Sequence, residues 1–374
     1  MGFFHPEHPV SGAGQFFGRE QLLRSLSTRL LQGRSFALCG GPRTGRTSML
    51  MQLEALIAER RHREPQAPKL IMVRVDVAKI GAGRAPQLFP AMWEHLTIAV
   101  RDPHLGGAPP PLATAKVRFD ARERLTETYL EASRSLWQPL VGTPAWCRYV
   151  LMLDNIDSLL NYEHAHEVHA LDALLRTRES EAPQAIVLTG GRLLREQLLD
   201  RRAPLHSARA VPLGILRQSE AVAVLRTGLS ELDAEGITMM LGTTGRHPYL
   251  LQRIGAELEQ QQGGFDVLEA TRQASHDAMQ LFEGIWAAFD FGRHVSYRGA
   301  YAAPEHALMQ LLVDAPQGVT IDHAERTLGI RPMREHAEFL ELVGVAEHVL
   351  HQDVPTWVAP NQLWNSWYQR RISY

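Results

Sequence analysis

The chain has 374 residues, more than one hydrophobic core normally organises, so we expect two or three domains. Hydrophobic residues make up 45% of it and charged residues 21%, which excludes a disordered or fibrous chain. The 39 basic and 41 acidic side chains leave a formal charge of −2. Contact with nucleic acid or an anionic membrane would therefore need a local patch of positive charge. Two cysteines and the lack of a long apolar run indicate a cytoplasmic protein without a membrane span.

The first half of the chain predicts alternating strands and helices. An amphipathic helix is expected within 16–32, and short apolar strands are expected at 35–39, 70–77, 149–153, 185–189 and 208–212. Helices are expected directly after the first strand, over 88–100, near 122–137 and up to 179, with a Pro- and Gly-rich loop over 102–113. This alternation predicts right-handed crossovers and a parallel sheet with helices on both faces.

The second half predicts a different architecture, because the strand signal disappears. Residues 218–289 are expected to be helical with breaks at 242–248 and 261–264, and short helices with a hairpin at 345–360 suggest a winged helix. The predicted fold is therefore α/β, with a parallel-sheet P-loop domain, a helical lid domain and a C-terminal winged-helix domain. The expected divisions are an N-terminal segment at 1–15 and domains at 16–212, 213–299 and 300–374.

A glycine-rich turn between the first strand and the next helix is the strongest chemical signal. It matches the phosphate-loop pattern GxxxxGK[ST] except at the lysine, and its residues are Gly40, Gly41, Pro42, Arg43, Thr44, Gly45, Arg46 and Thr47. Backbone N–H groups of such a loop face phosphate oxygens, and the threonine hydroxyl at its end ligates Mg²⁺. The pattern predicts ATP or ADP with Mg²⁺, and a strand-to-helix turn without a ligand is the alternative.

A second signal is the apolar strand 149–153, which runs into Asp154, Asn155 and Asp157. Asp154 is placed to hold the hydration shell of Mg²⁺, and a helix N-cap is the alternative. Both motifs depart from the expected pattern where the chemistry occurs, because Arg46 is a bulkier planar fork than lysine and Asn155 cannot accept a proton from attacking water. We expect slow or absent hydrolysis unless Asp157 or a partner supplies the base.

Five segments in this order resemble the prokaryotic STAND branch of the AAA+-related P-loop ATPases: FFGRE, GGPRTGRTSML, LMLDNID, LTGGR and GRHPYLLQ. The resemblance spans about Phe16 to the end of the chain. Carried over position by position, it implies Gly18 and Arg19 near the base, Gly40 to Ser48 on the nucleotide, Thr189 or Arg192 as the γ-phosphate sensor, and His247 with Pro248 as the turn that closes over the nucleotide. Arg192 joins Asp154 and Asp157 as an expected catalytic residue.

These features predict a nucleotide-binding regulatory switch or assembly module, with ATP favouring a closed arrangement of its domains. The chain has neither a repeat of about 20–50 residues nor a recognisable effector domain, so we expect a separate protein as effector or sensor, and a homo-oligomer is a further expectation. Two alternatives stay open: an active AAA+-type ATPase, and a DNA-binding initiator or transposition regulator. Nucleic acid is less expected, because residues 300–374 carry nine acidic side chains against five arginines, a net charge of −4.

Overall fold

The computed structural model describes residues 2–10, 16–64, 69–80, 87–100, 117, 119, 124–137, 147–160, 165–177, 184–261, 264–289, 295–297 and 300–372. The chain divides into two compact units. Residues 21–39 and 49–211 form one, here called the sheet unit, and residues 1–20, 40–48 and 212–374 form the other, the helical unit. The expected loop at 102–113 lies outside the described residues.

A five-stranded sheet with the order β2-β3-β4-β1-β5 organises the sheet unit. The strands are β1 (Phe36–Gly40), β2 (Lys69–Asp76), β3 (Cys147–Asp154), β4 (Gln184–Gly190) and β5 (Ala210–Leu213). The β1–β4, β2–β3 and β3–β4 pairs are parallel, and Asp76 lies opposite Asp154 in the β2–β3 register. The expected parallel sheet is confirmed, and it brings the carboxyl ends of β2 and β3 to one edge.

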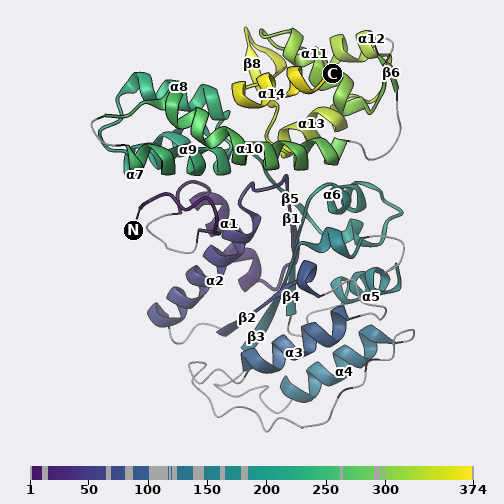
Figure 1. Ribbon diagram of the computed structural model, residues 1–374. Coiled ribbons are helices and arrows are strands. Elements are labelled where there is room, and N and C mark those ends of the chain that lie inside the picture. The colour runs from purple at the N-terminus through teal and green to yellow at the C-terminus, as the bar shows by residue number, and fades with distance from the viewer. Residues whose placement is uncertain are drawn as a thin grey trace. The chain divides into compact units, whose positions relative to one another are not determined.

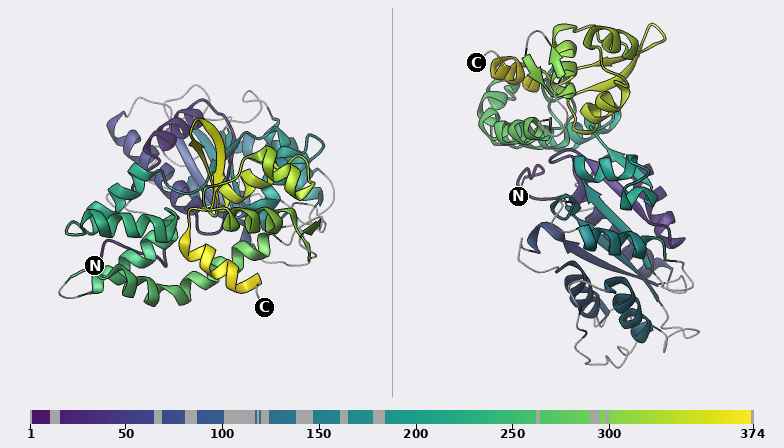
Figure 2. Two further views of the ribbon diagram at one scale, coloured as in Figure 1. Left: turned by 90° about the horizontal axis from the view of Figure 1, so that it is seen from above. Right: turned by 90° about the vertical axis from the view of Figure 1, so that its right-hand side faces the viewer.

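Helices cover both faces of this sheet, as the alternating pattern predicts (Figures 1 and 2). They are α1 (Glu20–Leu31), α2 (Arg46–Arg63), α3 (Leu88–Val100), α4 (Leu125–Trp137), α5 (Ala165–Leu175) and α6 (Arg192–Leu199). Figure 1 shows α1 and α2 on one face and α5 and α6 on the other. Because both faces are covered, β3 is apolar almost throughout, with residues 149–153 buried.

The helical unit begins its lid region with α7 (Gln218–Gly228), α8 (Ala234–Thr244), α9 (Pro248–Gln260) and α10 (Val267–Phe289). The N-terminal segment packs into this bundle, because the Phe4 ring fills space that Gly228 and Gly255 leave open and is almost fully buried. The N–H of Phe3 donates to Glu259 Oε1 at 2.6 Å. Phe3 and Phe4, which lie in the expected N-terminal segment 1–15, therefore belong to the hydrophobic core formed by α7 to α10.

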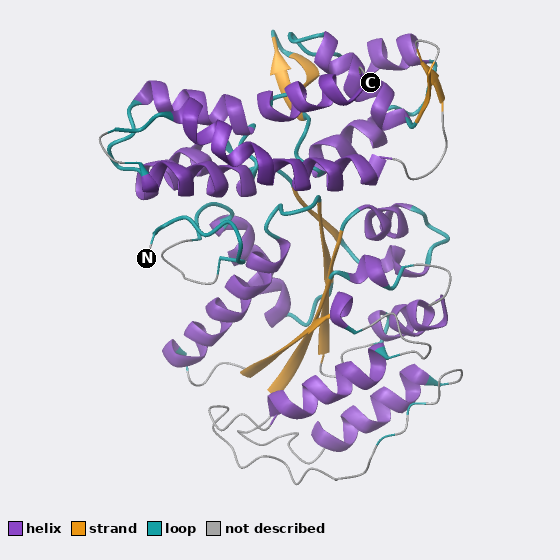
Figure 3. Ribbon diagram, in the orientation of Figure 1, coloured by secondary structure: helices purple, strands orange, loops and turns teal. Residues whose placement is uncertain are grey.

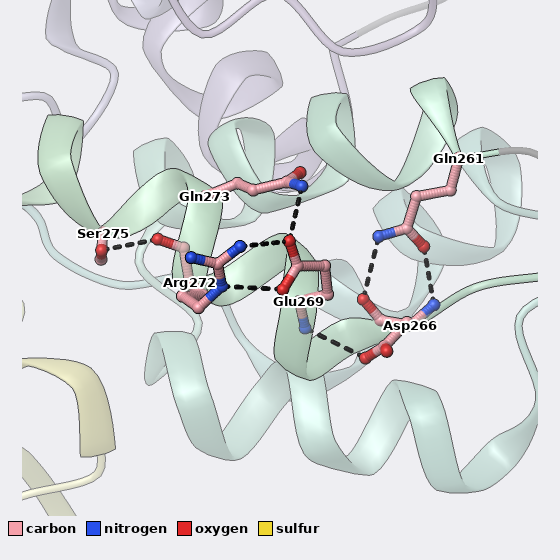
Figure 4. A network of polar contacts seen from close by, with 6 residues as sticks. All are labelled: Gln261, Asp266, Glu269, Arg272, Gln273 and Ser275. Atoms are coloured by element: carbon pink, nitrogen blue, oxygen red, sulfur yellow. Dashed lines mark hydrogen bonds and ion pairs between the residues drawn. The ribbon is translucent and has the colours of Figure 1, made fainter.

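The turn from α9 to α10 is held by a local polar network (Figure 4). Gln261 and Asp266 exchange two hydrogen bonds, of 3.1 and 2.7 Å, between the amide side chain and the backbone. Asp266 then caps α10 by accepting the N–H of Glu269 at 3.0 Å, and Glu269 receives two bonds from Arg272. Asp266 is thus a capping carboxylate that favours the N-terminus of α10, and residues 262–263 of the expected break lie outside the described residues.

The C-terminal region combines α11 (Pro304–Asp314), α12 (Ile321–Leu328) and α13 (Arg334–Leu342) with the hairpin β8 (Glu347–His351) and β9 (Val354–Val358), followed by α14 (Gln362–Ile372). Figure 3 shows these short strands among the helices. Val319 and Trp357 exchange backbone hydrogen bonds of 2.8 Å, which adds a bridge to the hairpin. The arrangement resembles a winged helix, as expected, and β6 (Val295–Tyr297) with β7 (Ala300–Ala302) forms a second hairpin that the sequence did not predict.

An aromatic cluster joins α14 to α10. Trp364 is fully buried, and its ring centroid lies 5.4 Å from that of Phe282 and 5.9 Å from that of Phe289. Such edge-on aromatic pairs stabilise a core beyond the area they bury. None of the described helices combines the length and the apolar composition that a bilayer span requires.

Candidate functional site

The glycine loop joins the end of β1 to the start of α2, and its backbone depends on small residues. Gly45 has a φ of +91° and Arg43 a φ of 54°, both in the left-handed region. Thr44 is fully buried, and its hydroxyl donates to the Gly41 carbonyl at 2.9 Å. A Cβ on Gly40 would lie 2.4 Å from the Thr44 hydroxyl. The loop therefore closes tightly before α2, whose N-terminus favours an anion.

Arg19 lies against this loop. Its Nη1 donates to the Thr44 carbonyl at 2.8 Å and its Nη2 to the Gly214 carbonyl at 2.5 Å, while Glu220 accepts the Arg19 backbone N–H at 2.8 Å. Burial lowers the pKa of Arg19 to about 10, and the Glu220 charge opposes this shift. Because the guanidinium stays charged at neutral pH, Arg19 ties the loop to the segment that precedes α7.

His247 approaches the loop from a turn about 200 residues further along the chain, where it precedes Pro248 at the first position of α9. The side chain is fully buried. Burial and, to a smaller extent, the Arg19 charge lower the pKa of His247 to about 3, although a hydrogen bond with the Pro42 backbone opposes both effects. His247 is therefore a neutral imidazole near Arg19 and Pro42, beside the glycine loop.

The end of α13 also contacts the loop, which the sequence did not predict. The Gly41 N–H donates to the Leu342 carbonyl at 3.0 Å, and a Cβ on Gly41 would lie 2.5 Å from the Cα of Val343. Gly344 has a φ of +84°, and a Cβ there would lie 2.7 Å from Cδ2 of His247. The glycines at both positions permit this close approach.

Two further side chains of the motif, Arg43 and Ser48, have partners within the helical unit. The Arg43 guanidinium lies 4.6 Å from the ring centroid of Tyr249, a cation–π distance. Ser48 Oγ accepts the N–H of Val10 at 3.0 Å, so the N-terminal segment contacts both α9 and the first turn of α2. Gly18 has a φ of +77°, which places the turn before α1 in a conformation that favours glycine.

The carboxyl end of β3 carries the acidic half of the predicted site, within the sheet unit. Asp154 is only 2% exposed and accepts a hydrogen bond from the Thr189 hydroxyl. Thr189 Oγ1 in turn accepts the Asn155 N–H at 3.1 Å, so this expected sensor is bound to the expected metal ligand. Asn155 has a φ of 60°, and its Nδ2 donates to Asp76 Oδ1 at 3.1 Å.

Asp157 and Arg192 have local partners. Asp157 accepts the N–H of Gly191 at 2.5 Å and that of Leu194 at 3.1 Å, which makes it a cap for α6. Arg192 is 14% exposed, and its Nε donates to Glu196 Oε1 at 2.7 Å, one turn along the same helix. These contacts give both residues a structural role, and their expected catalytic roles stay predictions.

The two expected Mg²⁺ ligands belong to different units, Thr47 to the helical unit and Asp154 to the sheet unit, and their roles as ligands stay predictions. Thr47 lies on the first turn of α2 and Asp154 at the end of β3, and hydroxyl and carboxylate oxygens are the ligands that Mg²⁺ prefers. Within the described ranges, no group of three His, Cys, Asp or Glu side chains could hold a metal ion alone.

No family model matches the chain, and no curated protein does. Solved structures do match. The Walker-type ATPase paby2304 of Pyrococcus abyssi is similar with 16% identity and a TM-score of 0.61, over 97% of this chain and 99% of its own. The Aeropyrum pernix ORC1 protein, solved in complex with DNA, is similar with 14% identity and a TM-score of 0.46, over 100% and 96%. A STAND protein with a tetratricopeptide repeat sensor from Pyrococcus horikoshii is similar with 12% identity and a TM-score of 0.41, over 96% and 43%. The likeness to the Walker-type ATPase concerns the fold alone: the chain has a P-loop fold of the same kind.

Proposed function

We propose that the chain binds ATP or ADP with Mg²⁺ at the glycine loop and acts as a slowly hydrolysing regulatory switch or assembly module in the cytoplasm. The observation that carries the proposal is the loop itself, with Gly45 at a φ of +91° between β1 and the N-terminus of α2. Such a loop presents backbone N–H groups and the positive end of a helix dipole, both of which favour phosphate. Thr47 and Asp154 are the proposed Mg²⁺ ligands.

The contacts around the loop support a role as a switch. Arg19, His247 and the Leu342–Gly344 segment come from three distant parts of the chain and all approach it. A nucleotide that binds one arrangement of these segments better than another shifts their populations by its difference in affinity. A partner that contacts the lid or the winged helix could then distinguish the ATP, ADP and free forms.

Slow hydrolysis is supported by two side chains. Arg46 keeps a positive charge at the lysine position of the loop but is planar and bulkier, so it does not reproduce a compact ammonium on the β- and γ-phosphates. Asn155 follows the strand aspartate where a carboxylate is expected, and an amide does not accept a proton. Both departures weaken the chemical step more than they weaken binding.

Charge supports protein partners, or a second copy of the chain, over DNA. The helix of this region that would enter a DNA groove is α13, whose acidic side chains Glu335, Glu338 and Glu341 would repel phosphates. Its C-terminal end already contacts the glycine loop through Leu342. The proposed role of the winged helix is therefore docking or coupling, and a DNA-binding regulator is the alternative that a DNA titration would reveal.

The test is an equilibrium titration of labelled ATP and ADP with Mg²⁺, followed by a phosphate-release assay on the same sample. We expect Gly45→Val to abolish binding, because a β-branched residue is strained at that φ, and Thr47→Ala to weaken the Mg²⁺-dependent part. Gly329→Val is the matched control, since Gly329 also has a positive φ but has no atom within 4 Å of an added Cβ. Arg46→Lys with Asn155→Glu should raise turnover. Lack of binding would refute the proposal, and rapid turnover by the natural chain would favour an active ATPase.

The lid turn is tested separately with Pro248→Ala. Pro248 starts α9 beside the buried His247, so a rigid turn at this position is expected to close over the nucleotide. We expect weaker affinity for ATP in this variant. Unchanged affinity would remove the turn from the proposed binding site.

A further inference from the structure

Residues 3–10 run within the helical unit from the lid to the phosphate-binding motif, and this segment is here called the strap. At one end, the N–H of Phe3 donates to Glu259 Oε1 on α9 at 2.6 Å. The N–H of His5 donates to Gln252 Oε1 on the same helix at 2.9 Å. The first turn of the strap is therefore bound to α9 through its own backbone.

Two aromatic rings fix this end of the strap by burial. Phe4 is 4% exposed, and a Cβ would lie 2.5 Å from its ring if added to Gly228 on α7, and 2.6 Å if added to Gly255 on α9. The Phe3 ring lies 5.5 Å from that of Phe17, in the turn that precedes α1. Because aromatic rings bury a large apolar area, Phe4 anchors the strap to the lid.

The other end of the strap lies on the phosphate-binding motif, where Ser48 Oγ accepts the Val10 N–H at 3.0 Å. Between the two ends, Glu7 lies within electrostatic reach of Tyr249 at the start of α9. Burial raises the pKa of Tyr249, the Arg43 charge lowers it, and the Glu7 charge raises it. Arg43 of the glycine loop lies 4.6 Å from the centroid of the same ring. The strap therefore passes beside the glycine loop before it reaches the first turn of α2.

We infer that the strap is part of the nucleotide site, where it positions Ser48 and ties the lid to the glycine loop. The inference rests on the proposed binding of ATP or ADP. A nucleotide held by the N–H groups of the loop would fix the same helix turn that the strap holds through Val10. Both then favour one arrangement of lid and loop, so each binds more tightly when the other is in place.

The composition of the strap suits this role. Pro6 and Pro9 restrict its backbone, which lowers the entropy that the free strap loses when it docks. Between them, Glu7 and His8 are exposed, and the His8 N–H donates to the His5 carbonyl at 3.4 Å in a turn. The strap thus has two separate points of attachment with solvated residues between them, and each can be weakened without changing the other.

Two variants of the full chain each weaken one attachment. Val10→Pro removes the N–H that Ser48 accepts, and Val10→Ala is its matched control because alanine keeps that N–H. Phe4→Ala removes the ring from the core of the lid. Its matched control is Met240→Ala, a truncation on α8 at a fully buried position of the same core.

Three quantities are measured for each chain under conditions in which it is folded. They are the rates at which labelled ATP and ADP dissociate in the presence of Mg²⁺, the hydrogen exchange of backbone N–H groups in the strap with and without nucleotide, and the midpoint of thermal unfolding. We expect Val10→Pro to raise the dissociation rate about fivefold, as for the loss of one hydrogen bond, and Phe4→Ala to raise it at least about tenfold.

Both controls should keep the natural dissociation rate within about twofold, although Met240→Ala should lower the unfolding midpoint as Phe4→Ala does. In the natural chain, a saturating nucleotide should slow exchange in the strap about tenfold, because the coupling between two binding events is reciprocal. A strap that only stabilises the lid would lower the unfolding midpoint when weakened but would leave dissociation and exchange unchanged.

The outcomes separate the inference from the proposed function. If the natural chain binds neither nucleotide, the proposed function fails and the inference fails with it. If the chain binds but Val10→Pro releases the nucleotide at the natural rate, the inference alone is overturned. It is also overturned if Met240→Ala accelerates release as much as Phe4→Ala does, or if the nucleotide leaves exchange in the strap unchanged.

Discussion

Acidification should destabilise the helical unit through His247. The side chain is fully buried, and burial lowers its pKa from 6.5 to about 3. In the unfolded chain the imidazole takes up a proton near pH 6.5, whereas in the folded chain it stays neutral down to about pH 3. The stabilising contribution is therefore fully present above pH 6.5 and decreases as the pH falls toward 3.

The size of the effect follows from the shift in pKa. Each pH unit between the two values corresponds to about 1.4 kcal/mol of unfolding free energy, so a drop from pH 6.5 to pH 5 should cost about 2 kcal/mol through this residue. The Arg19 charge adds to the penalty for a protonated ring, while the Pro42 carbonyl reduces it. Because the folded ring stays neutral down to about pH 3, the nucleotide affinity of the folded chain should not change through His247 between pH 6.5 and pH 5.

The assay compares urea unfolding of the natural chain and His247→Asn at pH 7.5 and at pH 5, observed by tryptophan fluorescence. Asparagine does not titrate in this range and is favoured at a helix N-cap, the position that His247 occupies before α9. Other titrating groups contribute equally to both chains, so the difference in their pH dependence isolates His247. Parallel pH profiles of the two chains would refute the assignment of a depressed pKa.

Further outcomes follow from contacts of the glycine loop and from charge. Arg19→Ala removes two charge-assisted bonds to carbonyls and should lower the unfolding midpoint and weaken ATP binding at least about tenfold, which isothermal titration would measure. Gly41→Ala should destabilise by about 1–3 kcal/mol, because the added Cβ meets the backbone of Val343 at 2.5 Å, whereas Gly242→Ala inside α8 should be neutral or slightly stabilising, since its Cβ meets nothing closer than 3.4 Å. The full chain should bind duplex DNA no more tightly than about 10⁻⁶ M, the upper end of non-specific affinity, in about 0.15 M salt; tighter, salt-sensitive binding in a fluorescence anisotropy titration would contradict the charge argument.

Local sequence patterns determined the fold class and located two parts of the candidate site, the glycine loop and the acidic end of the strand at 149–153. Continuous apolar runs such as 149–153 predict buried parallel strands, because both faces of such a strand are covered by helices. The glycine loop was recognisable because its geometry needs particular residue types at fixed spacings within eight consecutive positions. In each case the physical requirement acts between residues that are close together in the sequence. Both features can therefore be recognised from the sequence alone.

The tertiary structure alone decided which side chains meet. Asp76 and Asn155 are 79 positions apart, and they become partners only because the crossover after β2 places β3 beside it in register. Gly41 and Leu342 are likewise remote, and their hydrogen bond depends on the packing of α13 against the loop. Periodicity and motif spacing contain no record of such pairings, because they arise from the joint packing of elements whose sequences do not refer to one another.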